Sequence, residues 1–486
     1  MSEFSVLLSE YIHQKNYSIR ALAKRLNIPA ATLTKMCNGT RSPCNQKENI
    51  QRICDALMLT PLQRERLSDA LEKEILGEVR YTSRRSIKGL LESMNGFFLP
   101  ERRNIASIHL PPLAFADKKA DVYSIINAFF DNAAAGSALD VSFQPEDPVV
   151  LETLCRVIKS SPVKVRHIIV MTASDGKSGS VNAQNIDSVQ KIQPLILDSN
   201  KKINNYQPYY FYDRITKSSG NMLSFPNVFI SDQAVLCCSA DYSRAIYDTH
   251  PDKRRYGRRL FNSQIARCRP LITLYEDALQ QLHRYSRMMA VGSHTDIFRT
   301  LSWQPCLLWA ITEQEVRGFL SEQLPFRQEY ISLYLAYLYK IRERKHIQMY
   351  FTQEGLTELI MGGGIREIPD VCLAREIPLQ VRVELLNRLL AETMNGHIQP
   401  HIVREDKMKI GRDAQMISYG ADTIVLAALN HEDGNRVCFI EELSSNWSAL
   451  DFLENLEHTD WILTVEETCA VIRQSIEHAL AACRVE

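Results

Sequence analysis

The side chains best suited to chemistry lie in one basic segment, residues 18–43, which reads SIRALAKRLNIPAATLTKMCNGTRSP. Its lysine and arginine side chains can pair with phosphates, which supply most of the affinity of a protein for a nucleic acid. Its threonine hydroxyls can bond to base edges, and its alanine methyl groups can contact the methyl of thymine. The segment therefore favours duplex DNA as a ligand.

Two short helices joined by a tight turn must position these side chains. We predict a first helix over Ser18–Leu26, with Ser18 as its N-cap and Asn27 in a left-handed conformation at its end. The second helix is predicted over Pro29–Cys37, and the two must cross closely at the small residue Ala23. Because the major groove is about 12 Å wide and admits one α-helix, we expect the second helix to enter it with its N-terminal residues toward the bases.

This pair of helices resembles the helix-turn-helix of the Cro and lambda-repressor-like (XRE) transcriptional regulators, over about residues 3–75. That family packs five helices, so the resemblance implies an all-α, repressor-like domain over residues 1–76. The other helices are expected over Glu3–Lys15 and Gln46–Leu57, and from Pro61 onward with Thr60 as N-cap. A small helical bundle used for protein contact, as in some members of the family, is the alternative.

The predicted DNA contacts fall into two groups. Those near bases are Ala30, Ala31, Thr32, Thr34 and Lys35, and those near phosphates are Ser18, Arg20, Asn38, Thr40 and Arg41. The family often has polar side chains at the first exposed positions of its third helix, where this chain has Ala30 and Ala31. Because an alanine side chain cannot donate a hydrogen bond, direct readout at these two positions is limited to thymine methyl contact.

Charge is distributed unevenly along the chain, although the formal net charge is zero. Residues 1–100 contain 15 Lys and Arg against 10 Asp and Glu, whereas the remainder contains 42 against 47. A basic N-terminal part on a mildly acidic body fits a DNA-binding domain attached to a second function, and argues against a protein that coats nucleic acid everywhere. At 486 residues the chain is expected to form two to four domains.

The twelve cysteines form no CxxC pair and no cysteine–histidine cluster at zinc-finger spacing. Most lie in apolar runs, which indicates buried free thiols in a reducing cytoplasm. No apolar run reaches the roughly 18 residues that a membrane helix requires. We therefore expect a cytoplasmic protein without a metal, a cofactor or a membrane partner.

The rest of the chain reads as mixed α/β, which gives an α+β multidomain fold. A linker helix is expected within residues 77–105, and Val163–Met171 is the strongest strand of the sequence. Each half of the body reads as helix, strand, loop, several adjacent strands and helix. We therefore predict two α/β units of related topology, over residues 106–285 and 286–486.

This order is similar to that of phospholipase-D-like proteins, whose chemistry requires, in each half, a histidine nucleophile with a lysine two positions later. Within residues 106–486 no histidine has lysine at that position, and His401, for example, is followed by Ile402 and Val403. No GxSxG, P-loop or HExxH motif occurs, and the glycine run Met361–Ile365 lacks the partners of a phosphate loop. The sequence therefore predicts no catalytic residue and no enzymatic activity.

Together these features predict a sequence-specific DNA-binding transcriptional regulator. The α/β region would sense a small-molecule or peptide effector, dimerise, or both, and a homodimer would place two heads on a palindromic site about one helical turn apart. The basic run Lys253–Arg259 could hold a phosphorylated or acidic effector, although a solvated helix start explains it more simply. The alternatives are an enzyme or effector protein whose head serves only for targeting or protein docking, and an interaction scaffold.

Overall fold

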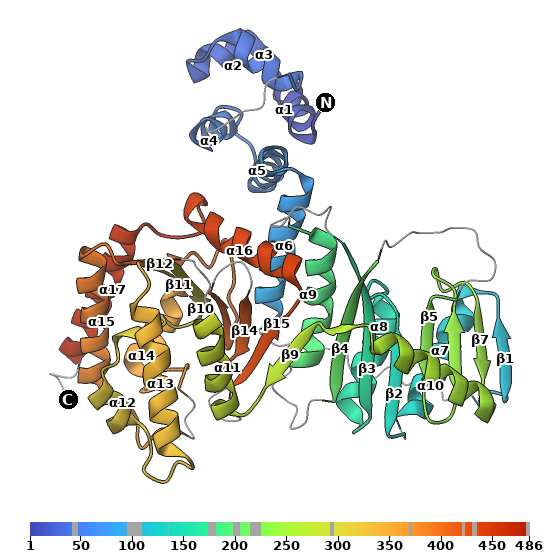
Figure 1. The fold of residues 1–486 in the computed structure, drawn as a ribbon. Coiled ribbons are helices and arrows are strands. Elements are labelled where there is room, and N and C mark those ends of the chain that lie inside the picture. Colours follow the sequence, from blue (N-terminus) through green and yellow to red (C-terminus); the bar gives the residue numbers. More distant parts are fainter. Residues whose placement is uncertain are drawn as a thin grey trace. The chain divides into compact units, whose positions relative to one another are not determined.

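The fold was analysed in a computed structural model, which describes residues 1–40, 47–94, 109–134, 136–173, 181–197, 205–213, 225–291, 296–368, 372–419, 423–429 and 435–482. The chain divides into two compact units, Met1–Arg85 and Ser86–Glu486. The first unit is helical, and the second contains two β-sheets with helices packed on them (Figure 1). The predicted helical N-terminal region followed by a mixed α/β region is confirmed.

The first unit contains five helices in the predicted order. They are α1 (Glu3–Gln14), α2 (Ile19–Leu26), α3 (Ala30–Cys37), α4 (Lys47–Ala56) and α5 (Pro61–Leu76). The start of α5 shows why these boundaries can be recognised from sequence. The hydroxyl of Thr60 accepts a hydrogen bond from the backbone N–H of Gln63, while the side chain of Gln63 accepts one from the backbone N–H of Thr60. This reciprocal cap, with Pro61 in the first turn, fixes the helix start.

A single apolar core holds these helices together. Its fully buried members include Phe4, Leu8, Leu22, Leu33, Ile53, Leu57 and Leu67. Helix α6 (Glu78–Ser93) follows α5, begins in the first unit and ends in the second. The leucines and isoleucine of its second half, Ile87, Leu90 and Leu91, belong to the core of the α/β unit.

The first sheet of the α/β unit has the strand order β1-β7-β6-β5-β2-β3-β4-β8. Strands β2, β3 and β4 are parallel, and β5, β6 and β7 form an antiparallel meander whose last strand pairs with β1. The strands are β1 (Leu113–Ala116), β2 (Ala138–Ser142), β3 (Lys164–Thr172), β4 (Tyr206–Asp213), β5 (Asn227–Ile230), β6 (Val235–Cys238), β7 (Ala245–Asp248) and β8 (Arg269–Pro270).

The second sheet repeats this arrangement, in the order β12-β11-β10-β13-β14-β15-β9. Strands β10, β11 and β12 are parallel, β13, β14 and β15 are antiparallel, and β9 pairs with β15 as β1 pairs with β7. The strands are β9 (Ile272–Tyr275), β10 (Ile297–Ser302), β11 (His346–Thr352), β12 (Ile398–Val403), β13 (Ala414–Ser418), β14 (Ile424–Ala428) and β15 (Arg436–Ile440). The two sheets therefore share one topology, as predicted for two related units.

The start of the second repeat differs from the predicted boundary. Strand β9 lies before residue 286 and nevertheless belongs to the second sheet, through its pairing with β15. The reason is that this pairing spans more than 160 residues of sequence, so that no local pattern reports it. We propose residue 271 as the boundary between the two α/β units.

Helices cover the sheets and bury two large apolar cores: one includes residues of both sheets, and the other belongs to the second repeat. In the first repeat they are α7 (Lys119–Ala133), α8 (Pro148–Ser160), α9 (Ala183–Leu197) and α10 (Pro251–Ile265); in the second they are α11 (Ala278–Val291), α12 (Glu313–Phe319), α13 (Arg327–Arg342), α14 (Gln353–Met361), α15 (Leu379–Met394), α16 (Leu443–Asn455) and α17 (Val465–Ala482). None of the helices among the described residues is both long and apolar enough for a bilayer crossing.

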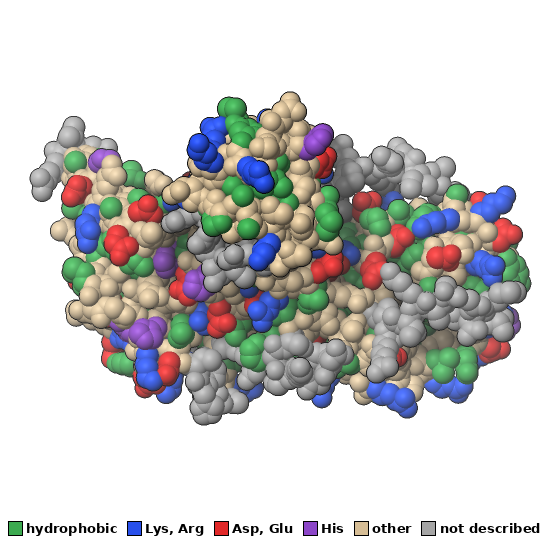
Figure 2. Space-filling model, turned by 90° about the horizontal axis from the view of Figure 1, so that it is seen from above, with side chains coloured by type: hydrophobic (Ala, Val, Ile, Leu, Met, Phe, Trp, Pro, Cys, Tyr) green, Lys and Arg blue, Asp and Glu red, His purple; other side chains and the backbone are tan. Residues whose placement is uncertain are grey.

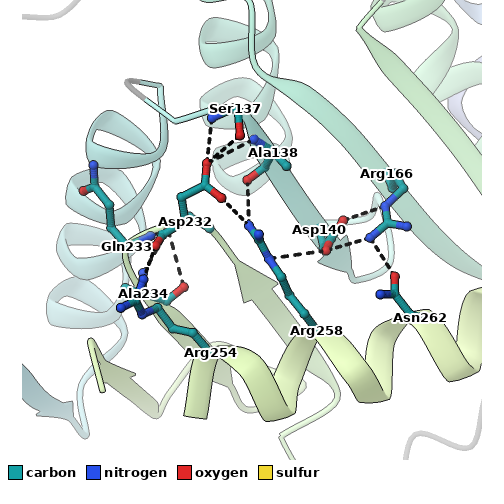
Figure 3. A network of polar contacts seen from close by, with 11 residues as sticks. Ser137, Ala138, Asp140, Arg166, Asp232, Gln233, Ala234, Arg254, Arg258 and Asn262 are labelled. Atoms are coloured by element: carbon teal, nitrogen blue, oxygen red, sulfur yellow. Dashed lines mark hydrogen bonds and ion pairs between the residues drawn. The ribbon is translucent and has the colours of Figure 1, made fainter. Parts of the chain in front are cut away.

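Helix α10 is attached to the first sheet by charged groups more than by an apolar stripe (Figure 3). Phe261 is the buried residue of this helix. Arg258 donates to the carboxylate of Asp232 at 2.7 Å, and its Nε lies 4.0 Å from the carboxylate of Asp140. Arg254 donates to the backbone carbonyl of Asp232. Two arginines of α10 are thereby bound to the sheet.

The same carboxylates also bind the sheet to itself. Asp232, in the turn between β5 and β6, accepts hydrogen bonds from the backbone N–H of Ser137 at 2.7 Å and from that of Ala138 at 3.3 Å. Asp140 accepts two hydrogen bonds from Arg166 of β3, at 2.7 and 2.9 Å, and Arg166 also donates to Asn262 of α10. The network therefore couples α10 to the start of β2 and to β3.

The ionisation of Asp232 reflects this setting. Burial alone would raise the pKa of its carboxyl, but hydrogen bonds from the backbone of Ser137 and from Arg258 outweigh burial and lower the pKa to about 2. The ordinary pKa is near 3.8. The ionised carboxylate therefore stabilises the fold fully above about that pH, and the contribution is lost as the pH falls through about 2.

Replacing the acceptor tests whether this network holds α10. We expect Asp232→Ala to destabilise the attachment of α10 by about 1–3 kcal/mol, because charged hydrogen bonds are lost and Arg258 loses a partner. Hydrogen exchange of the α10 amides at pH 7 should accelerate about 5- to 150-fold. The difference from wild type should shrink when the pH is lowered from 4 toward 2.

Asp296→Ala is the matched control, since Asp296 forms an exposed ion pair with Lys345 in the other repeat. Exchange in α10 should not change in this control. Equal exchange rates in Asp232→Ala and Asp296→Ala would show that the network does not hold the helix.

Candidate nucleic-acid interface

The turn between α2 and α3 is set by local backbone geometry. Asn27 adopts the left-handed conformation, with φ 56° and ψ 44°, and the N–H of Ile28 donates to the carbonyl of Ala23 at 3.0 Å. At the other end of α2, the hydroxyl of Ser18 accepts a hydrogen bond from the backbone N–H of Ala21 at 3.2 Å. The predicted N-cap and left-handed residue are both confirmed.

Apolar side chains seat α3 against α2 and the rest of the helical core. The buried residues of the two helices are Leu22, Ala23, Leu26, Leu33, Met36 and Cys37. Ala23 is 1% exposed, and a larger side chain at this position would separate the helices. One side of α3 is therefore fixed to the domain, and the opposite side is free for a ligand.

The free side of α3 carries small and polar residues. Ala31, Lys35 and Asn38 are exposed and Thr32 is half-buried. Positions i, i+1, i+4 and i+7 of a helix form one stripe along its axis. The predicted base contacts Ala31, Thr32 and Lys35 are therefore brought together on this stripe, together with the predicted phosphate contact Asn38.

Some of the other predicted contacts are half-buried or already form hydrogen bonds within the protein. Ala30 is half-buried and packs on the apolar core, and the hydroxyl of Thr34 donates to the carbonyl of Ala30 at 2.9 Å. The hydroxyl of Thr40 donates weakly to the carbonyl of Lys35, at 3.3 Å. Arg20 is exposed on α2. Arg41 lies outside the described residues.

The positive charge of this region arises from a long stretch of sequence without acidic residues. Residues 11–47 contain no aspartate or glutamate and seven cations, Lys15, Arg20, Lys24, Arg25, Lys35, Arg41 and Lys47. Figure 2 views the molecule from above the orientation of Figure 1, and shows separate Lys and Arg side chains over α2 and α3 with hydrophobic ones between them. A surface of this kind attracts polyanions.

Two of these cations were missed as candidate contacts. Lys24 and Arg25 are exposed in the last turn of α2, and Arg25 donates to the phenol oxygen of Tyr17 at 2.5 Å. The signal that finds them is the acid-free stretch, because periodicity alone assigns them only to a solvated helix face. The start of α3 is also open to an anion. Its N-cap Pro29 supplies no side-chain cap, so the first backbone N–H groups can donate hydrogen bonds to an anion.

The α/β unit contains buried titratable groups that were not predicted as sites. The carboxyl of Glu367 accepts a hydrogen bond from Gln415 at 2.7 Å, and burial raises its pKa to about 7 even though Cys306 and Gln415 oppose the shift. His401 has its Nδ1 2.9 Å from the carbonyl of Leu463 and stacks on Tyr350. In the described part of the chain no three His, Cys, Asp or Glu side chains are grouped to hold a metal ion.

The comparison with protein families identifies the N-terminal part. Residues 8–63 match the Cro/C1-type helix-turn-helix DNA-binding domain, which confirms the resemblance drawn from sequence. No curated protein matches the chain. The family match covers the region of α2 and α3, and the α/β unit is not part of it.

Solved structures that are similar to this chain include the following three. They are phosphatidylserine synthase of Haemophilus influenzae Rd KW20 (10% identity, 77% of this chain and 93% of that chain, TM-score 0.25), the archaeal chromatin protein TrmBL2, described with a novel mode of DNA binding (8%, 50% and 84%, 0.24), and polyphosphate kinase of Porphyromonas gingivalis (10%, 76% and 55%, 0.21).

These neighbours correct one prediction. The sequence predicts no enzymatic activity, whereas two of these three structures are enzymes. We withdraw the exclusion. We assign no reaction to the chain, because likenesses with TM-scores of 0.21 to 0.25 carry no argument about activity.

The N-cap of α2 gives a test that separates folding from ligand contact. We expect Ser18→Ala to destabilise α2 by about 1 kcal/mol, because the N–H of Ala21 loses its acceptor. Hydrogen exchange of the α2 amides should accelerate about fivefold. Ser18→Asp keeps an acceptor and suits the positive end of the helix, so it should retain wild-type exchange. If both variants lose protection equally, Ser18 does not act as the cap.

Proposed function

We propose that this protein binds double-stranded DNA through its N-terminal unit, with α3 in the major groove. The observation that carries the proposal is the outward stripe of α3, small and polar with Lys35 at its centre, within a stretch of seven cations and no acidic residue. An α-helix fits the major groove when its outer side chains are short enough to let it approach the base edges.

The contacts divide by their position on α3. Ala31, Thr32 and Lys35 lie on the outward stripe and are proposed to meet base edges, whereas Ala30 packs on the core and Thr34 donates to its carbonyl, so these two are proposed to contribute at the margin of the contact. For the phosphates the proposed contacts are the residues at the ends of the two helices, Ser18, Arg20, Asn38, Thr40 and Arg41. Phosphate contacts position a protein on the duplex, whereas base contacts carry the sequence preference.

A dimer on a palindromic site is proposed for the complex. Helix α3 has eight residues, and a single small module buries only about 600–1,000 Å² on DNA. Two heads that bind half-sites about 34–36 Å apart would double the contact without any new residue. The bound form is therefore proposed to be a homodimer of this chain.

Two roles of the α/β unit are compatible with the same DNA contact. In the first, the protein regulates transcription, and the body senses a small-molecule or peptide effector or joins two copies. In the second, the head targets an effector or enzyme to DNA. The size of the body favours the second role, because two complete α/β repeats exceed what dimerisation requires.

Lys35 provides the direct test of the DNA contact. A duplex ligand is first selected with the full-length protein from a pool of random sequences, and a regulator should enrich a palindrome. On that duplex, Lys35→Ala should weaken binding about 5- to 150-fold in a gel-shift titration, as expected for loss of about 1–3 kcal/mol from one base contact.

Arg66→Ala is the control, since Arg66 is an exposed cation of α5 outside α2 and α3. It should bind like wild type at the same salt concentration. An unchanged affinity of Lys35→Ala would contradict the assigned face of α3.

A further inference from the structure

The segment that follows strand β7 is a second centre of positive charge, far along the chain from the helix-turn-helix. Residues 251–270, PDKRRYGRRLFNSQIARCRP, contain seven Lys and Arg and one acidic residue, Asp252. They include all of α10. The remainder of the α/β region is mildly acidic, so this concentration of cations is local rather than a property of the whole unit.

The cations of α10 sort into two sets by their partners. Arg254 and Arg258 point to Asp232 and take part in the network that attaches the helix (Figure 3). Lys253 pairs with Asp248 of β7. Arg254 and Arg258 are held against the sheet and are not available to a ligand, whereas the side chain of Lys253 is 63% exposed but already paired.

The second set faces solvent. Arg255 and Arg259 of α10 are exposed, and so is Arg267, two residues beyond the end of the helix. The pair of Arg255 with Asp252 is a surface pair whose side chains are 78% and 70% exposed, so it competes weakly with a stronger anion. Arg259 lies 5.2 Å from the ring centre of Tyr256, which is itself exposed. Arg255 and Arg259 are one helical turn apart, about 6 Å along the axis.

This sorting identifies the kind of ligand. Arginine presents several N–H donors in a planar fork that matches phosphate oxygens, and an exposed aromatic ring beside it is typical of nucleic-acid surfaces. A membrane-surface helix would need a broad apolar face, and the exposed apolar side chains of α10 are Tyr256 and Leu260. The charge and the narrow apolar contact favour a phosphate backbone over a bilayer.

We propose that the exposed arginines of α10, Arg255 and Arg259, with Arg267 just after the helix, bind the phosphate backbone of duplex DNA as a second, sequence-independent contact. This inference rests on the proposed function, since the helix-turn-helix brings the duplex to the protein. The α10 contact adds affinity by releasing further counterions and contributes no base preference. The attachment of α10 through its inward arginines leaves the outward ones presented on a fixed helix.

Salt dependence measures the number of phosphate contacts directly. Binding of the full-length protein to a fluorescent 30-bp duplex of arbitrary sequence is followed by anisotropy between 50 and 200 mM NaCl. Each phosphate contact contributes about 0.9 to the slope of log affinity against log salt. Arg255→Ala, Arg259→Ala and Arg267→Ala combined should therefore reduce the magnitude of the slope by about 2.7 relative to wild type.

Two further variants make the result specific. The control removes Arg317, Lys340 and Lys345, three cations of the second repeat that also form exposed surface pairs, and it should keep the wild-type slope. A helix-turn-helix variant, Arg20→Ala with Lys35→Ala, should lose about 0.9 from the slope, because Arg20 is proposed to meet a phosphate and Lys35 a base edge.

The outcomes separate the two claims. If the α10 variant has the slope of wild type or the slope of its control, the α10 contact is overturned, whatever the helix-turn-helix variant does. If the helix-turn-helix variant binds like wild type while the α10 variant loses slope, the proposed function fails and the α10 contact remains. Unchanged thermal unfolding of the triple variant, expected for exposed side chains, excludes loss of the fold as the cause.

Discussion

The proposed DNA contact depends on one apolar contact, the packing of α3 against α2. Leu33 and Met36 are buried on one side of α3, and Ala23 lets the two helices approach closely. This contact decides which side of an eight-residue helix faces solvent. It is reinforced by the left-handed Asn27, which turns the chain between the helices without strain that a β-branched residue would suffer. Every proposed DNA contact follows from this orientation.

Helices α3 and α10 are each attached to the protein on one side and exposed on the other. In α3 the inner side is apolar and the outer side carries Lys35, whereas in α10 the inner side is ionic and the outer side carries Arg255 and Arg259. The inner contacts differ because α3 packs in a core of helices, while α10 lies beside two carboxylates, the half-buried Asp232 and the buried Asp140. In each case, fixing one side presents the other to a polyanion.

Sequence reasoning succeeded where the determinants are local. The N-cap Ser18 and the capping box at Thr60 define helix ends within a few residues, so the five helices could be placed in order. Sequence patterns do not reveal helix α9, which contains Pro194. The predicted order has a loop followed directly by strands in this region. Strand β9 was not predicted, and the predicted boundary fell after it because its partner β15 is distant in sequence. The half-burial of Ala30 likewise depends on packing that the pattern of one helix does not report.

The groove that receives α3 can be determined chemically. Dimethyl sulfate methylates guanine at N7, which faces the major groove, and adenine at N3, which faces the minor groove. A duplex selected by the full-length protein is methylated before binding, and bound and free fractions are compared base by base. The account predicts that N7-methylated guanines at fixed positions are depleted from the bound fraction. Interference confined to adenine N3 would contradict it.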